Sequence, residues 1–148
     1  MLILVLADRE HRFTKEMMDM ALKLPRLGPK RMRGVLRGSE CLFGKELSDF
    51  PQARLGEVDV LVSAIFAGGQ PKVIEELWPK LTKATWIHSL SAGVDTLMPV
   101  LARIPGTEPV PVTNAKGAFS RSLAEYALCA MLHFCKQIPR LQAPRRAV

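Results

Sequence analysis

The stretch that decides the fold of this chain is Thr85-Trp86-Ile87-His88-Ser89-Leu90-Ser91-Ala92-Gly93-Val94-Asp95. Its first half is a short apolar run, and small residues with a glycine follow at once. This pattern predicts a strand that ends in a tight turn, where backbone N–H groups converge on one point. A following helix N-terminus would add partial positive charge. Such a turn suits a small carboxylate or a phosphate, although many strand-to-helix turns use glycine and aspartate for geometry only.

The rest of the chain alternates between apolar runs of strand length and segments with helical spacing. The expected strands are residues 1–7, 59–67, 85–90 and 110–113, with a further short strand near Val35 and Leu36. The expected helices are residues 14–24, with Thr14 as its N-cap, 71–78, 94–103 and 119–138. Alternation of this kind predicts an α/β fold with a mostly parallel sheet.

The last expected helix, residues 119–138, is apolar on nearly every turn. A helix that is apolar on most sides has to be buried on most sides. A small sheet domain can cover only one of these sides, so a further partner surface is expected. Ser122 and Glu125 have the spacing of a capping box, and Ser120 is a competing cap.

Composition excludes several classes of protein. With 148 residues and 48% hydrophobic residues the chain is expected to be globular. No apolar run approaches the roughly 20 residues that span a bilayer. The apolar start lacks the basic region of a signal peptide, so a cytoplasmic location is expected. Three separated histidines and three cysteines without CxxC spacing predict no metal site and reduced, partly buried thiols.

The net charge of +7 raises the question of nucleic-acid binding. Six basic residues lie between Lys23 and Arg37, and no acidic residue lies between Asp19 and Glu40. This basic run contains no aromatic residue and has two prolines, whereas a nucleic-acid surface interleaves aromatic groups or a recognition element. We therefore interpret it as a solvated loop and expect no nucleic-acid partner.

Five motifs, in this order, resemble the D-isomer-specific 2-hydroxyacid dehydrogenases, the group that contains glyoxylate and hydroxypyruvate reductases and phosphoglycerate dehydrogenase. They are Trp86-Ile87-His88, Ser91-Ala92-Gly93-Val94-Asp95, Val112-Thr113-Asn114, Gly117 and Leu123-Ala124-Glu125-Tyr126. The likeness is good from about residue 81 to 140 and fails between residues 23 and 50. It implies a flavodoxin-like, parallel-sheet substrate-binding domain over residues 1–113. Residues 114–148 would then be the hinge and long interdomain helix, the start of an NAD-binding Rossmann half that is absent from this chain.

The resemblance also assigns a site. The backbone N–H groups of Ala92 and Gly93 would bind the substrate carboxylate, and a side chain at Gly93 would block the close approach of an anion. The supporting loop and hinge residues would be Ser91, Val94, Asp95, Asn114 and Gly117, with Asp95 interpreted as a helix cap.

The reaction implied is reversible hydride transfer between a nicotinamide cofactor, NAD or NADP, and a small 2-keto or 2-hydroxy acid. The family's catalytic Arg, Glu and His follow a dinucleotide fingerprint, and this chain has no G-x-G-x-x-G. No catalytic, cofactor-binding or metal-binding residue is therefore assigned, and His88 and His133 are interpreted as packed histidines. The expectation is a truncated, substrate-binding portion of a dehydrogenase that is inactive alone. The alternative is a non-catalytic interaction module that forms a homodimer or binds a relative through helix 119–138.

Overall fold

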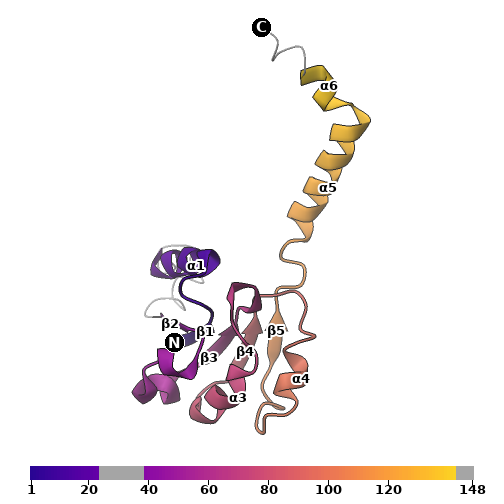
Figure 1. Cartoon of the computed structure of the whole chain (residues 1–148). Helices are drawn as coiled ribbons and strands as arrows, with labels where there is room; N and C mark the ends of the chain where they lie inside the picture. Colours follow the sequence, from indigo (N-terminus) through magenta and orange to yellow (C-terminus); the bar gives the residue numbers. More distant parts are fainter. Residues whose placement is uncertain (24–38, 143–148) are drawn as a thin grey trace. The chain divides into compact units, whose positions relative to one another are not determined.

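A five-stranded parallel sheet forms the centre of the chain up to residue 115 (Figure 1). Its strands are β1 (Leu2–Leu6), β2 (Glu40–Gly44), β3 (Val60–Ser63), β4 (Trp86–Ser89) and β5 (Val112–Asn114). They follow the order β2-β1-β3-β4-β5, and every neighbouring pair is parallel. This is the order of doubly wound, flavodoxin-like domains, so the predicted fold class is confirmed.

The computed structural model describes residues 1–23 and 39–142. They divide into two units, Met1–Ala115 and Lys116–Val148. The strand expected near Val35 and Leu36 and nearly all of the basic run lie outside the described residues.

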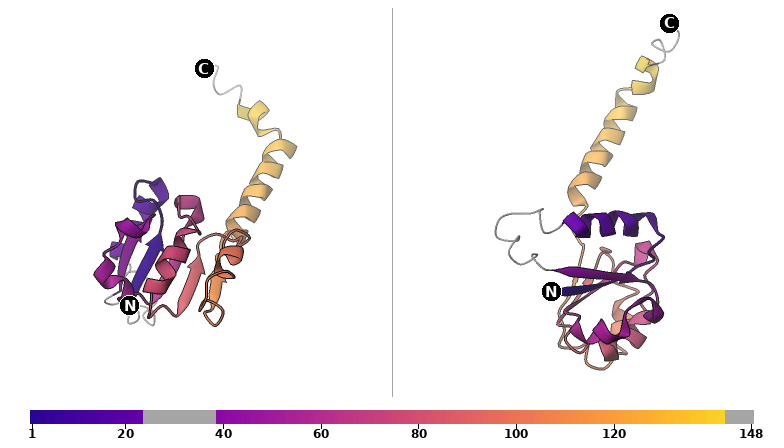
Figure 2. Two further views of the ribbon diagram at one scale, coloured as in Figure 1. Left: turned by 60° about the horizontal axis from the view of Figure 1, so that its bottom comes forward. Right: turned by 90° about the vertical axis from the view of Figure 1, so that its left-hand side faces the viewer.

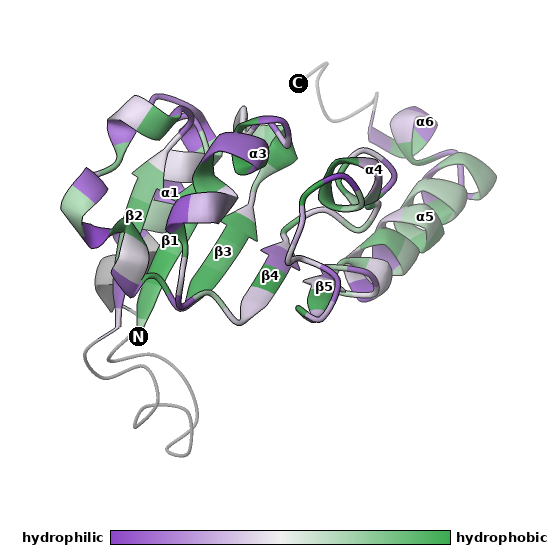
Figure 3. Ribbon diagram, turned by 90° about the horizontal axis from the view of Figure 1, so that it is seen from below, coloured by the Kyte–Doolittle hydropathy of each residue, from purple (hydrophilic) through white to green (hydrophobic). Residues whose placement is uncertain are grey.

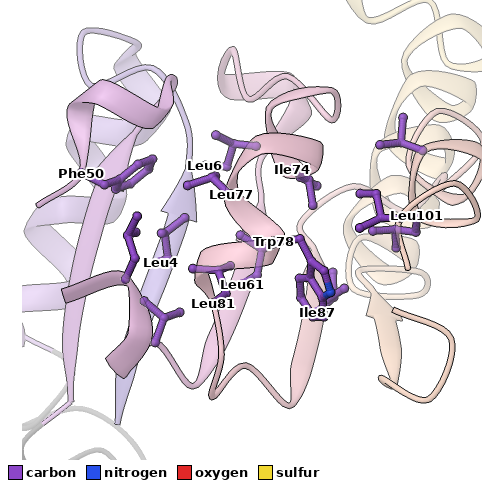
Figure 4. Close-up of a cluster of buried hydrophobic side chains, with 14 of the residues drawn as sticks. Leu4, Leu6, Phe50, Leu61, Ile74, Leu77, Trp78, Leu81, Ile87 and Leu101 are labelled. Atoms are coloured by element: carbon purple, nitrogen blue, oxygen red, sulfur yellow. The ribbon is translucent and has the colours of Figure 1, made fainter. Parts of the chain in front are cut away.

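The first face of the sheet carries the larger core. Leu4 and Leu6 of β1, Leu61 of β3 and Ile87 of β4 all point to it and are fully buried. Burial of each such side chain contributes about 1.5–3 kcal/mol. Helices α3 (Val73–Leu77) and α4 (Met98–Leu101) and the 3₁₀ turns η3 (Gln52–Glu57) and η5 (Trp78–Lys80) cover this face (Figure 4).

The second face of the sheet is covered over its β1–β2 half. Val5 and Phe43 pack there with Met17 of helix α1 (Arg12–Lys23), and η4 (Ile65–Ala67) adds Ala67. Figure 2 shows α1 on one side of the sheet and, on the other, the turns that directly follow β2 together with α3. At the β4–β5 end of the second face, the Trp86 and Thr113 side chains remain exposed.

The second unit consists of α5 (Ser120–Cys135) and α6 (Ile138–Gln142). The break between them lies at Gln137, which has a φ of 50°. Helix α5 has no buried residue although it is mainly hydrophobic (Figure 3). Its exposed large apolar side chains are Leu123, Tyr126, Leu128, Met131, Leu132 and Phe134. Within the described part of the chain, none of the helices has the length and apolar character needed to cross a membrane.

Several expected boundaries differ from the structure. Helix α1 begins at Arg12, so Thr14 lies inside its first turn and is not its cap. The strand expected over residues 59–67 ends at Ser63 and continues as η4, because the backbone turns after Ala64. The N-cap of α5 is Phe119, without a side-chain cap hydrogen bond, because Ser122 Oγ donates to the Phe119 carbonyl and Glu125 pairs with Arg121. Cys129 and Cys135 are exposed and only Cys41 is partly buried, because α5 has no buried side.

Candidate functional site

The residues predicted to bind an anion lie at the carboxyl end of β4, where open α/β sheets bind their ligands. Two hydrogen bonds fix the start of this loop. The Leu90 N–H donates to the Ser63 carbonyl over 3.0 Å, and the Ser91 N–H donates to Ser89 Oγ over 3.2 Å. The loop therefore leaves the sheet in a defined direction.

The end of β5 holds the next two residues of the loop. Asn114 Nδ2 donates to the Ala92 carbonyl over 3.0 Å, and the Ala115 N–H donates to the Ser91 carbonyl over 3.2 Å. Because β4 and β5 are paired with Ser89 opposite Asn114, the Asn114 side chain is within reach of the loop. Asn114 was expected at a hinge, and the structure brings it directly to the predicted binding loop.

These contacts leave a set of backbone donors free. Among the described residues, the N–H groups of Ala92, Gly93 and Val94 donate to no acceptor in the chain. In a trans peptide the C=O and N–H point in opposite directions. Since the Ala92 carbonyl faces Asn114, the Gly93 N–H faces away from Asn114. Adjacent backbone N–H groups without partners are suited to binding a carboxylate or phosphate oxygen.

The space above Gly93 is open. A Cβ atom built there would meet one atom within 4 Å, Asp95 Oδ2 at 3.3 Å. The φ of Gly93 is not in the left-handed region, so the backbone does not require glycine at this position. What glycine provides is room, and Ala92 and Gly93 are both exposed. Their role in binding a carboxylate stays a prediction.

Asp95 does not cap α4, contrary to the interpretation of the sequence. Helix α4 begins three residues later, its N-cap is Leu97, and no side chain makes a cap hydrogen bond. The Val94 carbonyl instead accepts from the Leu97 and Met98 N–H groups. Because α4 has only four residues, its dipole adds little positive charge to the loop.

Gly117 lies in the second unit and has a φ of 90°, in the left-handed region that favours glycine. A Cβ there would meet nothing within 4 Å, so this glycine is explained by backbone conformation and not by close packing. Its role as a hinge stays a prediction.

A polar cluster on the exposed end of the second sheet face was not anticipated. Trp86 Nε1 donates to Thr113 Oγ1 over 2.8 Å, and His88 Nδ1 lies 2.7 Å from the same hydroxyl oxygen. Burial lowers the pKa of His88, which favours the neutral ring. The pairing of His88 with Thr113 depends on the β4–β5 register, which the sequence does not reveal. The His88 ring therefore makes a hydrogen bond to Thr113 of β5.

The described residues form neither a metal site nor a diphosphate cradle at the glycines after β3. No group of three His, Cys, Asp or Glu side chains among them could hold a metal. The adjacent glycines after β3 are crowded, because a Cβ at Gly69 would collide with the Leu6 carbonyl and a Cβ at Gly68 would lie 2.9 Å from Asp8 Cβ. They pack against β1 and leave no cradle for a diphosphate at this turn.

Comparison with known proteins gives a fold relationship. No protein-family model matches the chain, and no curated protein matches its sequence. Among solved structures, it is similar to a D-isomer specific 2-hydroxyacid dehydrogenase family protein from Aeromonas salmonicida subsp. salmonicida, at 24% identity and a TM-score of 0.50. That match covers 98% of this chain and 39% of the other.

It is also similar to a D-lactate dehydrogenase from Aquifex aeolicus complexed with NAD and lactic acid, at 17% identity and a TM-score of 0.48. This second match covers 99% of the chain and 37% of the other protein. The chain thus spans about two fifths of the length of these structures. The description of the Aeromonas structure names the family that the sequence resembles, and the likeness to it shows a shared fold.

Proposed function

We propose that this chain forms the substrate-binding portion of an NAD(P)-dependent D-2-hydroxyacid dehydrogenase. In this proposal the loop of residues 91–95 holds the carboxylate of a small 2-keto or 2-hydroxy acid, and the backbone N–H groups of Ala92 and Gly93 donate to its oxygens. Residues 1–113 form the substrate-binding domain, and residues 114–148 form the hinge and interdomain helix. The proposed location is the cytoplasm.

The proposal rests mainly on the free backbone N–H groups of the loop, whose backbone is fixed by hydrogen bonds at its start and by a hydrogen bond from Asn114. The Leu90 N–H donates to β3, the Ser91 N–H donates to the end of β4, and Asn114 donates to the Ala92 carbonyl. These bonds fix the backbone without using the free donors. A site with donors already in position loses little conformational entropy when it binds an anion. The fold shared with the Aeromonas structure, and the motifs over residues 86–126, support the assignment to this class of enzyme.

The proposal also concerns the groups that hydride transfer needs besides a carboxylate site. Hydride transfer to a 2-keto acid needs a cationic group to polarise the carbonyl and a proton donor. Among the described residues, no arginine or histidine side chain makes a hydrogen bond or ion pair with the loop of residues 91–95. We therefore propose that the catalytic Arg, Glu and His and the cofactor site belong to residues outside this chain. The chain alone binds the substrate acid without turning it over.

Amide NMR signals of the isotope-labelled chain test this function. Addition of pyruvate should shift the signals of Ala92 and Gly93 saturably, whereas acetamide, which has a similar size but no charge, should not. Turnover is measured separately with pyruvate and reduced nicotinamide cofactor, and none is expected. Absence of any shift at Ala92 and Gly93 would refute the carboxylate site, and clear turnover would refute the requirement for residues outside the chain.

The second unit supports a further candidate function, an interaction module. None of the 16 residues of α5 is buried. A groove of about 670 Å³ runs along this unit and is lined by Glu125, Leu128, Cys129, Leu132, His133, Lys136 and Ile138. We propose that α5 associates with a second copy of the chain through this groove.

Sedimentation equilibrium tests the association. Leu128→Glu should shift the chain toward monomer, because it places a charge in the apolar groove. Tyr126→Glu is the matched control, since its side chain projects about 200° around the helix from that of Leu128. A wild-type chain that remains monomeric at all concentrations would contradict this second function and leave the first unaffected.

A further inference from the structure

The side chain of Asp95 lies beside the proposed carboxylate site and is available to a ligand. Its Oδ2 is the one atom within 4 Å of a Cβ built on Gly93, at 3.3 Å. The residue is exposed. Among the described residues, no hydrogen bond or ion pair involves its carboxylate, and it does not cap α4. A negative charge with unused acceptor capacity thus borders a row of unused N–H donors.

We propose that Asp95 determines specificity at this loop by accepting a hydrogen bond from a donor next to the ligand's carboxylate. The loop therefore prefers a 2-hydroxy acid to the 2-keto acid of the same size. This inference rests on the proposed function, because it assumes that Ala92 and Gly93 bind the carboxylate. It assigns to Asp95 a specificity role in place of the structural role expected from the sequence.

The chemistry of the two ligands differs in one group. Both acids carry a carboxylate, and the charge of Asp95 repels both to the same degree. A 2-hydroxyl group can donate to the Asp95 carboxylate in a charge-assisted hydrogen bond, which is stronger than a neutral one. A 2-keto oxygen is only an acceptor and gains nothing from Asp95. The hydroxy acid therefore offsets the repulsion, and the keto acid does not.

Because the site is exposed to solvent, the charge of Asp95 should change the affinity for a ligand only modestly. Two unit charges several ångströms apart at a hydrated surface change an equilibrium constant by about threefold. Screening reduces this effect when the separation exceeds the Debye length of about 8 Å. Removing the charge of Asp95 should therefore strengthen pyruvate binding about threefold at low salt. The same change should strengthen lactate binding less, because lactate loses a charge-assisted hydrogen bond.

Titration of the full, isotope-labelled chain with lactate and with pyruvate provides the test, followed through the amide signals of Ala92 and Gly93. The wild-type chain should bind lactate about threefold or more tightly than pyruvate. In Asp95→Asn this ratio should fall toward one, mainly because pyruvate binds more tightly. Asp95→Glu keeps the charge and the acceptor and should retain a preference for lactate. Glu76→Gln changes the net charge equally on an exposed side chain of α3 and should leave the ratio unchanged.

Two results would overturn the inference in distinguishable ways. If both acids shift Ala92 and Gly93 but Asp95→Asn leaves their affinity ratio unchanged, Asp95 has no specificity role and the proposed function stands. If neither acid shifts these signals, the carboxylate site itself is wrong and the role of Asp95 is refuted with it. Because Asp95 and Glu76 are both exposed, all three variants should give the dispersed spectrum of the folded chain.

Discussion

Asn114 holds Ala92 across the strand pair β4–β5: its Nδ2 atom donates to the Ala92 carbonyl over 3.0 Å. The two residues are 22 positions apart in sequence, and the parallel register brings them together. This bond fixes the peptide that carries the Gly93 N–H, so a residue on one strand orients a donor in the loop after the other. The following predictions test this arrangement and its surroundings.

Asn114→Ala should weaken pyruvate binding at the loop about fivefold, because one hydrogen bond that orders the peptide contributes about 1 kcal/mol. Asn114→Asp should weaken it further, since a carboxylate cannot donate to the Ala92 carbonyl and also repels the ligand. NMR titration measures both. Unchanged affinity in both variants would show that the loop is ordered without Asn114.

Gly93→Ala should weaken pyruvate binding without lowering the free energy of unfolding. The Gly93 backbone does not need glycine, so the free energy of unfolding should be unchanged or raised by roughly 0.5 kcal/mol. Pyruvate binding should weaken, because the added methyl group occupies the open space above the loop. Chemical denaturation and NMR titration provide the two readouts. Equal affinity in the variant and the wild-type chain would place the anion elsewhere.

Gly117→Ala is the contrasting glycine substitution. Its φ of 90° puts any other residue in a strained conformation, which costs about 1–2 kcal/mol. We expect fewer helical signals from α5 and α6, measured by circular dichroism and amide exchange, with an intact sheet in the first unit. If the second unit is undisturbed, the left-handed conformation at Gly117 is not required.

His88 should make stability depend on pH in a defined direction. Burial lowers the pKa of His88 in the folded chain below the value of about 6.5 in the unfolded chain. The unfolded chain therefore binds more protons as the pH falls through about 6.5, and the contribution of His88 is complete above that pH and declines below it. This decline in the free energy of unfolding ends once the pH is below the pKa of His88 in the folded chain. Urea unfolding of the wild type and of His88→Gln across this range should show the difference, and parallel curves would exclude His88 as the source.

Asp49 should stabilise the turn after β2. Its Oδ2 accepts the N–H groups of Lys45 and Glu46, over 2.8 and 3.0 Å. These bonds lower its pKa. Asp49→Ala should lower the free energy of unfolding by about 1 kcal/mol at neutral pH. Because the folded pKa is depressed, this contribution is present above the unfolded pKa of about 3.9 and is lost as the pH falls through the folded value. A penalty that persists unchanged in acid would contradict the assignment to the carboxylate.

The sequence was sufficient to predict those parts of the fold in which one local pattern dominates. The continuous apolar runs of β1 and β3 correctly predicted buried parallel strands, because both faces of such a strand are covered. The run of β4 correctly predicted a strand, but Trp86 on its second face is exposed. β2 was missed because its five residues begin with Glu40, end with Gly44 and have no long apolar run. The extent of α5 was overestimated, since apolar spacing continues through Gln137, where the helix breaks.

The sequence singled out the candidate loop but could not assemble it. A glycine-containing turn after a strand drew attention to residues 91–95, and the family resemblance assigned Ala92 and Gly93 as carboxylate binders, which stays a prediction. The bond from Asn114 to Ala92, however, depends on the β4–β5 register, which no local pattern encodes. Asp95 was interpreted as a cap because aspartate often precedes helices, and the interpretation failed because α4 starts only after a further turn.

The most direct test of the account is a crystal structure of the chain grown with lactate. We predict that one carboxylate oxygen or both accept hydrogen bonds from the Ala92 and Gly93 N–H groups, with the Asn114–Ala92 bond intact. Lactate bound elsewhere, while these two N–H groups face solvent or bond to the chain itself, would contradict the proposal that this loop is the carboxylate site.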